Sequence, residues 1–181
     1  MVNQSVTLLS VIKSKKIIMK ELLQQYADYN IWATKQLLDR INKLSDEEIN
    51  REIASSFSSV YKTLQHMWLA EEAWWQRLKL VEHLDLQSEK FAGSFPELTL
   101  HLTKQSQLWA DWIRAATNTQ LEHVFAYRNT KKEEFKQPVS EVIMHLFNHG
   151  SYHRGQLVTL LRQLGADKIP QTDFIVFSRK R

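Results

Sequence analysis

The sequence contains no cysteine, and only four glycines and three prolines occur among its 181 residues. Without cysteine the chain has no disulfide, no thiolate ligand for a metal and no nucleophilic thiol of its own. So few glycines and prolines leave little material for the many tight turns of a β-sandwich or barrel. The frequent residues, among them Leu, Gln, Glu, Lys and Ala, favour helices. These features predict one all-α domain whose core is stable without covalent cross-links.

Long hydrophobic runs are also missing. No stretch approaches the roughly 18 apolar residues that a membrane-spanning helix needs. Residues 6–12 are apolar, but Thr7 and Ser10 interrupt them and lysines follow, whereas a secretory signal has about 7–15 apolar residues and a small-residue cleavage site. We therefore expect a cytoplasmic protein that does not bind membranes.

The positive net charge of +4 is concentrated at the chain ends. Residues 21–178 contain 17 basic and 20 acidic residues, and the other basic residues are Lys13, Lys15, Lys16, Lys20, Arg179, Lys180 and Arg181. A nucleic-acid-binding domain would carry a basic stripe on a structured face. The mildly acidic body therefore predicts no nucleic-acid partner.

The segment 1–18 differs from the remainder of the chain. It is rich in lysine and only weakly periodic, and Met19 precedes the most regular amphipathic segment of the N-terminal half. We therefore predict that residues 1–18 are an N-terminal extension and that residues 19–181 form a single domain.

Four segments have apolar residues at the three- and four-residue spacing of amphipathic helices. They span about 20–43, 59–80, 96–117 and 138–164. Ser58 or Ser59 is the expected N-cap of the second segment, Gly165 is the expected C-cap of the last, and residues 45–48 resemble a capping box. Between the third and fourth segments, the pattern of residues 123–135 indicates a small β-hairpin or an extended crossover. The sequence thus predicts a four-helix bundle with long crossover connections.

Three of the seven histidines, His145, His149 and His153, follow one another at steps of four in the last helical segment. On a helical wheel, His153 lies within the apolar arc and His149 at its edge, so these two are the inward pair, and His145 lies further out. Two neutral imidazoles in a dry interior need partners, and one divalent ion satisfies both. Ordinary hydrogen bonds to core histidines are the alternative, and the spacing alone leaves both open.

A metal site would need a third ligand from another helix. His66 is the best candidate because it lies in the middle of the second segment, at the edge of its apolar arc, and His101 is the reserve. The helical zinc-protease signature is excluded because Gly150, not glutamate, follows His149. Di-iron bundles are excluded as well, since no glutamate has a histidine three residues later.

The same residues resemble the DinB/YfiT-like superfamily. Residues 146–156, LFNHGSYHRGQ, with Leu164-Gly165 and the following PQTDF, are similar to the last-helix motif of that superfamily. Two further stretches agree with it, residues 29–33 and residues 64–75. The resemblance covers about residues 20–177. It implies a four-helix bundle that binds a divalent metal, such as zinc, nickel, manganese or iron, through His66, His149 and His153.

The resemblance also implies chemistry. Three protein nitrogens leave coordination positions open, as in catalytic metal sites, and the superfamily includes metal-dependent transferases that use low-molecular-weight thiols such as bacillithiol or mycothiol. We expect a divalent-metal-dependent enzyme, either a thiol S-transferase or a hydrolase acting on small molecules, and a homodimer. The alternative is a non-enzymatic, stress-associated metal-binding bundle.

Other residues near these motifs have two interpretations each. Glu71 lies in the apolar arc of its helix, so its carboxylate is either paired structurally or, as a catalytic candidate, supports the metal ligands or transfers protons. For Arg154 a solvated position is favoured over contact with an anionic substrate. Gly150 and Gly155 are expected to be close-packing positions. The tryptophans are expected in the core, with an apolar mouth above the metal as the alternative; they are Trp68, Trp74, Trp75, Trp109 and Trp112.

Overall fold

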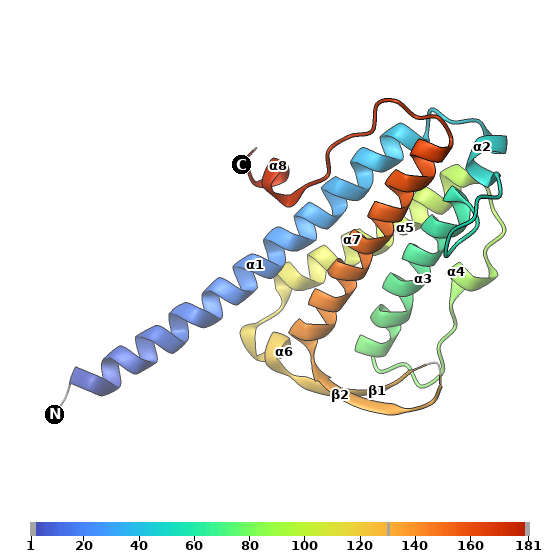
Figure 1. Cartoon of the computed structure of the whole chain (residues 1–181). Coiled ribbons are helices and arrows are strands. Elements are labelled where there is room, and N and C mark those ends of the chain that lie inside the picture. Colours follow the sequence, from blue (N-terminus) through green and yellow to red (C-terminus); the bar gives the residue numbers. More distant parts are fainter. Residues whose placement is uncertain (1–2, 130, 180–181) are drawn as a thin grey trace.

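Four long helices frame the computed structural model, which describes residues 3–129 and 131–179, with side chains from residue 19 onward (Figure 1). These helices are α1 (Asn3–Ile41), α3 (Val60–Leu78), α5 (Phe95–Ala115) and α7 (Val139–Gln163). Both α1 and α3 pack against α5 and α7, so α1 and α3 lie on one diagonal of the bundle. The predicted all-α four-helix bundle is confirmed.

Local capping explains where α3 and α5 begin and where α7 ends. The Ser59 side chain accepts a hydrogen bond from the backbone N–H of Lys62 at the start of α3. At the start of α5, Ser94 and Glu97 form a reciprocal capping box. After α7, Gly165 has φ +82°, a left-handed conformation that costs glycine no strain. The boundaries predicted for these three helices are confirmed to within about two residues.

The first helix begins much earlier than predicted. The periodic pattern predicts a start near residue 20, but α1 begins at Asn3. Residues 3–19 contain no proline or glycine, so nothing in this stretch breaks a helix, even though its apolar pattern is weak. This part of α1 projects beyond the other three helices (Figure 1). Its independence from the domain at 19–181 stays a prediction.

Short elements occupy the long connections and the segment after α7. They are α2 (Asp46–Asn50), α4 (Gln87–Lys90), α6 (Asn118–Glu122), the strands β1 (Val124–Arg128) and β2 (Glu134–Pro138), and α8 (Phe174–Ser178). The capping box predicted at residues 45–48 opens α2. The strands pair antiparallel, with Tyr127 opposite Phe135, and confirm the predicted hairpin before α7. Among the described residues, no helix is long and apolar enough to cross a membrane.

The core consists of two apolar clusters, one toward each end of the bundle. One contains Leu37, Leu64, Leu98 and Leu157 with their neighbours, and the other contains Leu23, Trp109, Ile113, Ile143 and Phe147 with theirs. Between the clusters, each long helix contributes buried polar side chains, namely Asn30 and Thr34 from α1, Glu71 from α3, Gln105 and Ser106 from α5, and His153 and Arg154 from α7. We call these seven residues the polar layer. It lies at the level of the predicted metal ligands.

Candidate metal centre

Two helices bring the predicted ligands together. His66 projects from α3, and His149 and His153 project from α7 one turn apart. The Nε2 atom of His149 lies 3.2 Å from Nε2 of His66 and 3.0 Å from Nε2 of His153. All three ligand nitrogens lie within 4.8 Å of one another. We call these residues the three-histidine cluster.

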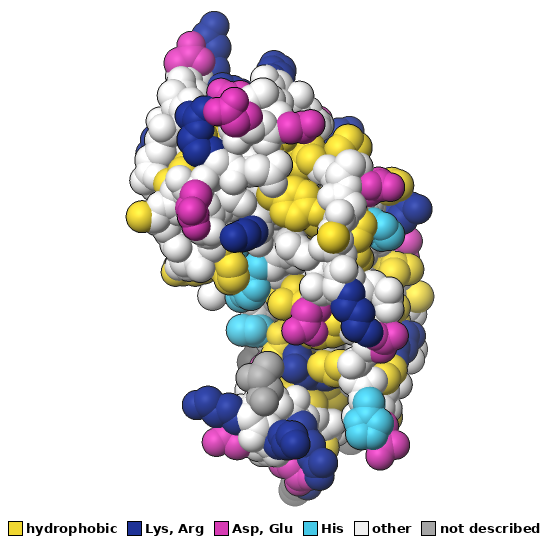
Figure 2. Space-filling view, turned by 90° about the vertical axis from the view of Figure 1, so that its right-hand side faces the viewer, with side chains coloured by type: hydrophobic (Ala, Val, Ile, Leu, Met, Phe, Trp, Pro, Cys, Tyr) yellow, Lys and Arg dark blue, Asp and Glu magenta, His cyan; other side chains and the backbone are white. Residues whose placement is uncertain are grey.

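The donor set of the cluster fits a divalent transition metal. Zinc binds imidazole nitrogen at about 2.0–2.1 Å, so two tetrahedral ligands have nitrogens roughly 3.3 Å apart, close to the two shorter separations. His153 is buried, whereas His66 and His149 are partly exposed, so the cluster has a buried and an accessible side. On the face shown in Figure 2, histidine side chains reach the surface beside an indentation of the molecule.

Burial keeps the cluster neutral. Burial, and then the neighbouring imidazole of His153, lowers the pKa of both His66 and His149 to about 4. The pKa of His153 is also lowered by burial, although its hydrogen bond to Gln156 opposes the change. Neutral imidazoles present the lone pairs that a metal needs, so near neutral pH little free energy is spent on removing protons.

Two residues that the sequence analysis missed hold the rings in place. Nδ1 of His153 lies 2.7 Å from Oε1 of Gln156, so an Nδ1–H donor leaves the Nε2 lone pair directed at the cluster. The Phe57 ring stacks on His66, with centroids 4.0 Å apart, and meets His153 edge-on. Gln156 lies within the last-helix motif, residues 146–156, and three residues after His153. Its side chain is therefore on the same side of α7 as His153, and this spacing could have predicted the contact. Phe57 lies in the irregular segment before α3, where no periodic pattern marks it.

The other four histidines are not among the predicted ligands. His145 is exposed, and its ring contacts those of Trp74 and His149, so it lies beside the cluster. His101, the reserve ligand, stacks on Trp68 instead. His83 and His123 are exposed.

Arg154 is buried, and the prediction of a solvated side chain is wrong. Its exposed fraction is 2%, and its guanidinium donates to Asn30 Oδ1 and to Ser151 Oγ and lies over the Tyr29 ring. Hydrogen bonds and a ring face replace the water that the charge loses. The acceptor on α1 is 124 positions away in sequence, which is why the pattern of α7 alone could not reveal it.

Glu71 is buried in the polar layer, with its carboxylate accepting from the hydroxyl of Ser106 at 2.8 and 2.9 Å. Burial raises its pKa to about 7, while the hydrogen bond from Ser106, the charge of Arg154 and a hydrogen bond from Asn30 partly oppose the rise. These partners favour the structural interpretation of Glu71. Its catalytic role stays a prediction.

Two further predictions need correction. A Cβ atom on Gly150 would lie 2.9 Å from Asn30 Oδ1, so Gly150 is a close-packing position, but Gly155 has open space and is not. Trp68 and Trp109 are buried in the core as predicted, while Trp74, Trp75 and Trp112 are partly buried. Among the described ring contacts, no tryptophan touches the three-histidine cluster. The apolar wall of the cluster is Phe57, not a tryptophan mouth.

The fold and the site together define a class of protein. This class consists of helical bundles with long crossover connections, in which two helices bring three imidazoles together. The chain belongs to the DinB family, which matches residues 19–180. It is 32% identical over 157 residues to Protein DinB of Bacillus subtilis (strain 168). The aligned region covers 81% of this chain and 88% of that protein. The fold is similar to the crystal structure of a DinB-like protein from Bacillus cereus, with a TM-score of 0.66 and 22% identity over 83% of this chain and 95% of that one.

Proposed function

We propose that this protein is a divalent-metal-dependent enzyme that acts on small molecules at the three-histidine cluster. The observation that supports the proposal is the convergence of three imidazole nitrogens within 4.8 Å. With three protein donors among the described residues, coordination positions remain for a substrate or water, which is the arrangement of a catalytic rather than a structural site. Membership of the DinB family agrees with a metal-associated role. Zinc, nickel, manganese and iron are the candidate ions.

The reaction that fits best is transfer of a low-molecular-weight thiol to an electrophile, with hydrolysis of a small molecule as the other reaction. A divalent ion supplies a Lewis acid that lowers the pKa of a thiol or of water. The protein contributes His66, His149 and His153 as ligands. Gln156 fixes the tautomer of His153, and Phe57 shields the His66 ring from water. Since the chain has no cysteine, the sulfur comes from the substrate.

Metal binding is tested with full-length protein purified without a chelating resin. We expect one equivalent of metal by elemental analysis, and titration calorimetry with each candidate ion then identifies the preferred one. His149→Ala should abolish stoichiometric binding. His145→Ala is the matched control, because it removes an exposed imidazole one turn earlier on α7 and should retain the metal. Equal metal content in the wild type and in the His149→Ala, His153→Ala double variant would overturn the assignment.

Activity is tested with the metal-loaded protein and monochlorobimane as electrophile. Bacillithiol, mycothiol, glutathione and coenzyme A are compared as thiol donors, and a panel of small esters and amides tests hydrolysis. Thiol-dependent turnover that is lost in His149→Ala but retained in His145→Ala supports the transferase. Loaded protein without any rate above background in either panel would favour the non-enzymatic, stress-associated metal binder.

Cytoplasmic location and a homodimer complete the proposal. The absence of cysteine suits a reducing compartment, and low-molecular-weight thiols are reduced there. Light scattering coupled to size-exclusion chromatography measures the oligomeric state directly, and a monomeric mass at micromolar concentration would contradict the dimer.

A further inference from the structure

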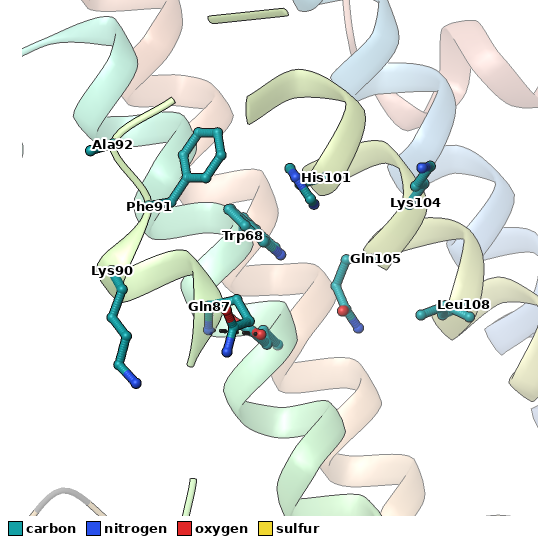
Figure 3. Close-up of a pocket in the computed structure, with 10 residues that line it drawn as sticks. Trp68, Gln87, Lys90, Phe91, Ala92, His101, Lys104, Gln105 and Leu108 are labelled. Atoms are coloured by element: carbon teal, nitrogen blue, oxygen red, sulfur yellow. Dashed lines mark hydrogen bonds between the residues drawn. The ribbon is translucent and has the colours of Figure 1, made fainter. Parts of the chain in front are cut away.

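A cavity lies outside the three-histidine cluster, between α3, α4 and α5. Its volume is about 530 Å³, within the range of small-molecule sites. Its aromatic wall consists of Trp68, His101 and Phe91. The Trp68 and His101 rings stack with centroids 4.7 Å apart, and Phe91 meets both edge-on. Figure 3 shows Trp68 between Phe91 and Gln105, and Leu108, which is 46% exposed, lies further along α5.

Gln105 brings an unused hydrogen-bond donor to this cavity. Its side chain is 8% exposed and lines the cavity, yet its Nε2 atom is buried and has no hydrogen-bond partner. It is the only such side-chain atom among the described residues. Buried polar groups are nearly always paired, so an orphan donor calls for a cause. The terminal amide torsion of glutamine is broad, so a small rotation would direct this N–H to an acceptor in the cavity.

The charged groups around the cavity favour an acceptor with negative charge. Glu72 also lines the cavity, but its carboxylate is held at α4, where it accepts from the backbone N–H groups of Gln87 and Ser88 and from the Ser88 hydroxyl. Lys90 is paired with Asp85 at 2.7 Å. By contrast, no carboxylate lies within salt-bridge distance of the exposed Lys104 in the described part of the chain.

We propose that this cavity binds a small aromatic carboxylate. The ring of the ligand lies against Trp68, Phe91 and Leu108, and its carboxylate accepts from Gln105 Nε2 and faces Lys104. The cavity combines an apolar aromatic surface with one hydrogen-bond donor and one cation. Small-molecule sites commonly have this composition, in which a few polar groups fix the orientation of the ligand. The site is separate from the three-histidine cluster, since His101 and Trp68 belong to it and the metal ligands do not.

The experiment uses isotope-labelled full-length protein and 2-naphthoate, with the 2-naphthylmethylammonium cation as a ring-matched probe of opposite charge. Nitrogen–proton correlation spectra report on the Gln105 side-chain amide and the Trp68 indole N–H. We expect 2-naphthoate to shift both signals and the cation to shift neither. Gln105→Leu should weaken 2-naphthoate binding about tenfold, the loss of one hydrogen bond to a charged acceptor. Lys104→Met should reduce the preference for the carboxylate over the cation.

Two control variants test whether binding depends on this cavity. Gln107→Leu removes an exposed amide on the same helix, bonded to Asp111, and should leave binding unchanged. His149→Ala should bind 2-naphthoate as the wild type does, because the metal ligands take no part. Thermal unfolding of Gln105→Leu without ligand checks its fold, and a higher midpoint is expected because the orphan donor is gone. The proposal is overturned if 2-naphthoate shifts neither signal at millimolar concentration, or if Gln105→Leu and wild type bind it equally.

Discussion

Replacing Glu71 by glutamine is expected to stabilise the protein above neutral pH and to leave its stability nearly unchanged in acid. Glutamine has the size of the protonated carboxyl and can still accept from the Ser106 hydroxyl, which lies 2.8 Å from the carboxylate. It carries no charge, so it removes the cost of holding an ionised group in the polar layer.

The magnitude follows from the pKa of Glu71, which burial raises from 4.5 to about 7 on folding. Because the folded state holds this proton more tightly, the stabilising contribution is present below the unfolded pKa and is lost as pH rises through about 7. The loss across that window is roughly 3 kcal/mol. Relative to wild type, Glu71→Gln should therefore gain up to about 3 kcal/mol at pH ~8, or about 6–12 °C in unfolding midpoint for a chain of this size.

The assay is denaturant unfolding of metal-free protein at a series of pH values, with the difference between variant and wild type as the quantity of interest. Histidine titration is common to both proteins and cancels in that difference. Glu141→Gln, which changes an exposed carboxylate on α7, is the matched control and should show no such dependence on pH. If Glu71→Gln is less stable than wild type at pH ~8, the attraction between Glu71 and Arg154 outweighs burial and the reasoning is refuted.

Three further outcomes are expected. Gly150→Ala should lower the free energy of unfolding by about 1–3 kcal/mol, because the new Cβ would lie 2.9 Å from Asn30 Oδ1. Gly155→Ala should raise it by about 0.5–1 kcal/mol, because the Cβ there has open space. Equal effects of the two variants in denaturant unfolding would contradict this. Deleting residues 1–18 should leave thermal stability almost unchanged, and a loss of several kcal/mol would show that they pack on the domain. Metal affinity, measured by calorimetry, should decline as the pH falls toward about 4, the pKa of His66 and His149. An affinity that already declines around pH 6.5, the ordinary pKa of histidine, would contradict this.

Much of this architecture is predictable because its determinants are local. The caps at Ser59 and Ser94 join atoms three residues apart, and amphipathic spacing places His149 and His153 on one side of a single helix. The predicted start of α1 is wrong because a weak apolar pattern does not end a helix, whereas proline, glycine or a competing cap does. Which helices pack together is harder to predict from the sequence, because those contacts join distant residues. The helical wheel places His66 only at the edge of the apolar arc, so its assignment as third ligand depends on the family resemblance.

The sequence by itself determined the four long helices, the caps at Ser59, Ser94 and Gly165, and the two histidines that share a face, since those features depend on neighbours within one or two turns. Only the tertiary structure decided the polar layer. Arg154 is buried because Asn30, 124 positions away, accepts from it, and Glu71 is held by Ser106, 35 positions away. Whether a polar side chain is buried or solvated depends on such distant partners, because a charge leaves water only where hydrogen bonds and an opposing charge replace it. The residues of a single helix do not specify those partners.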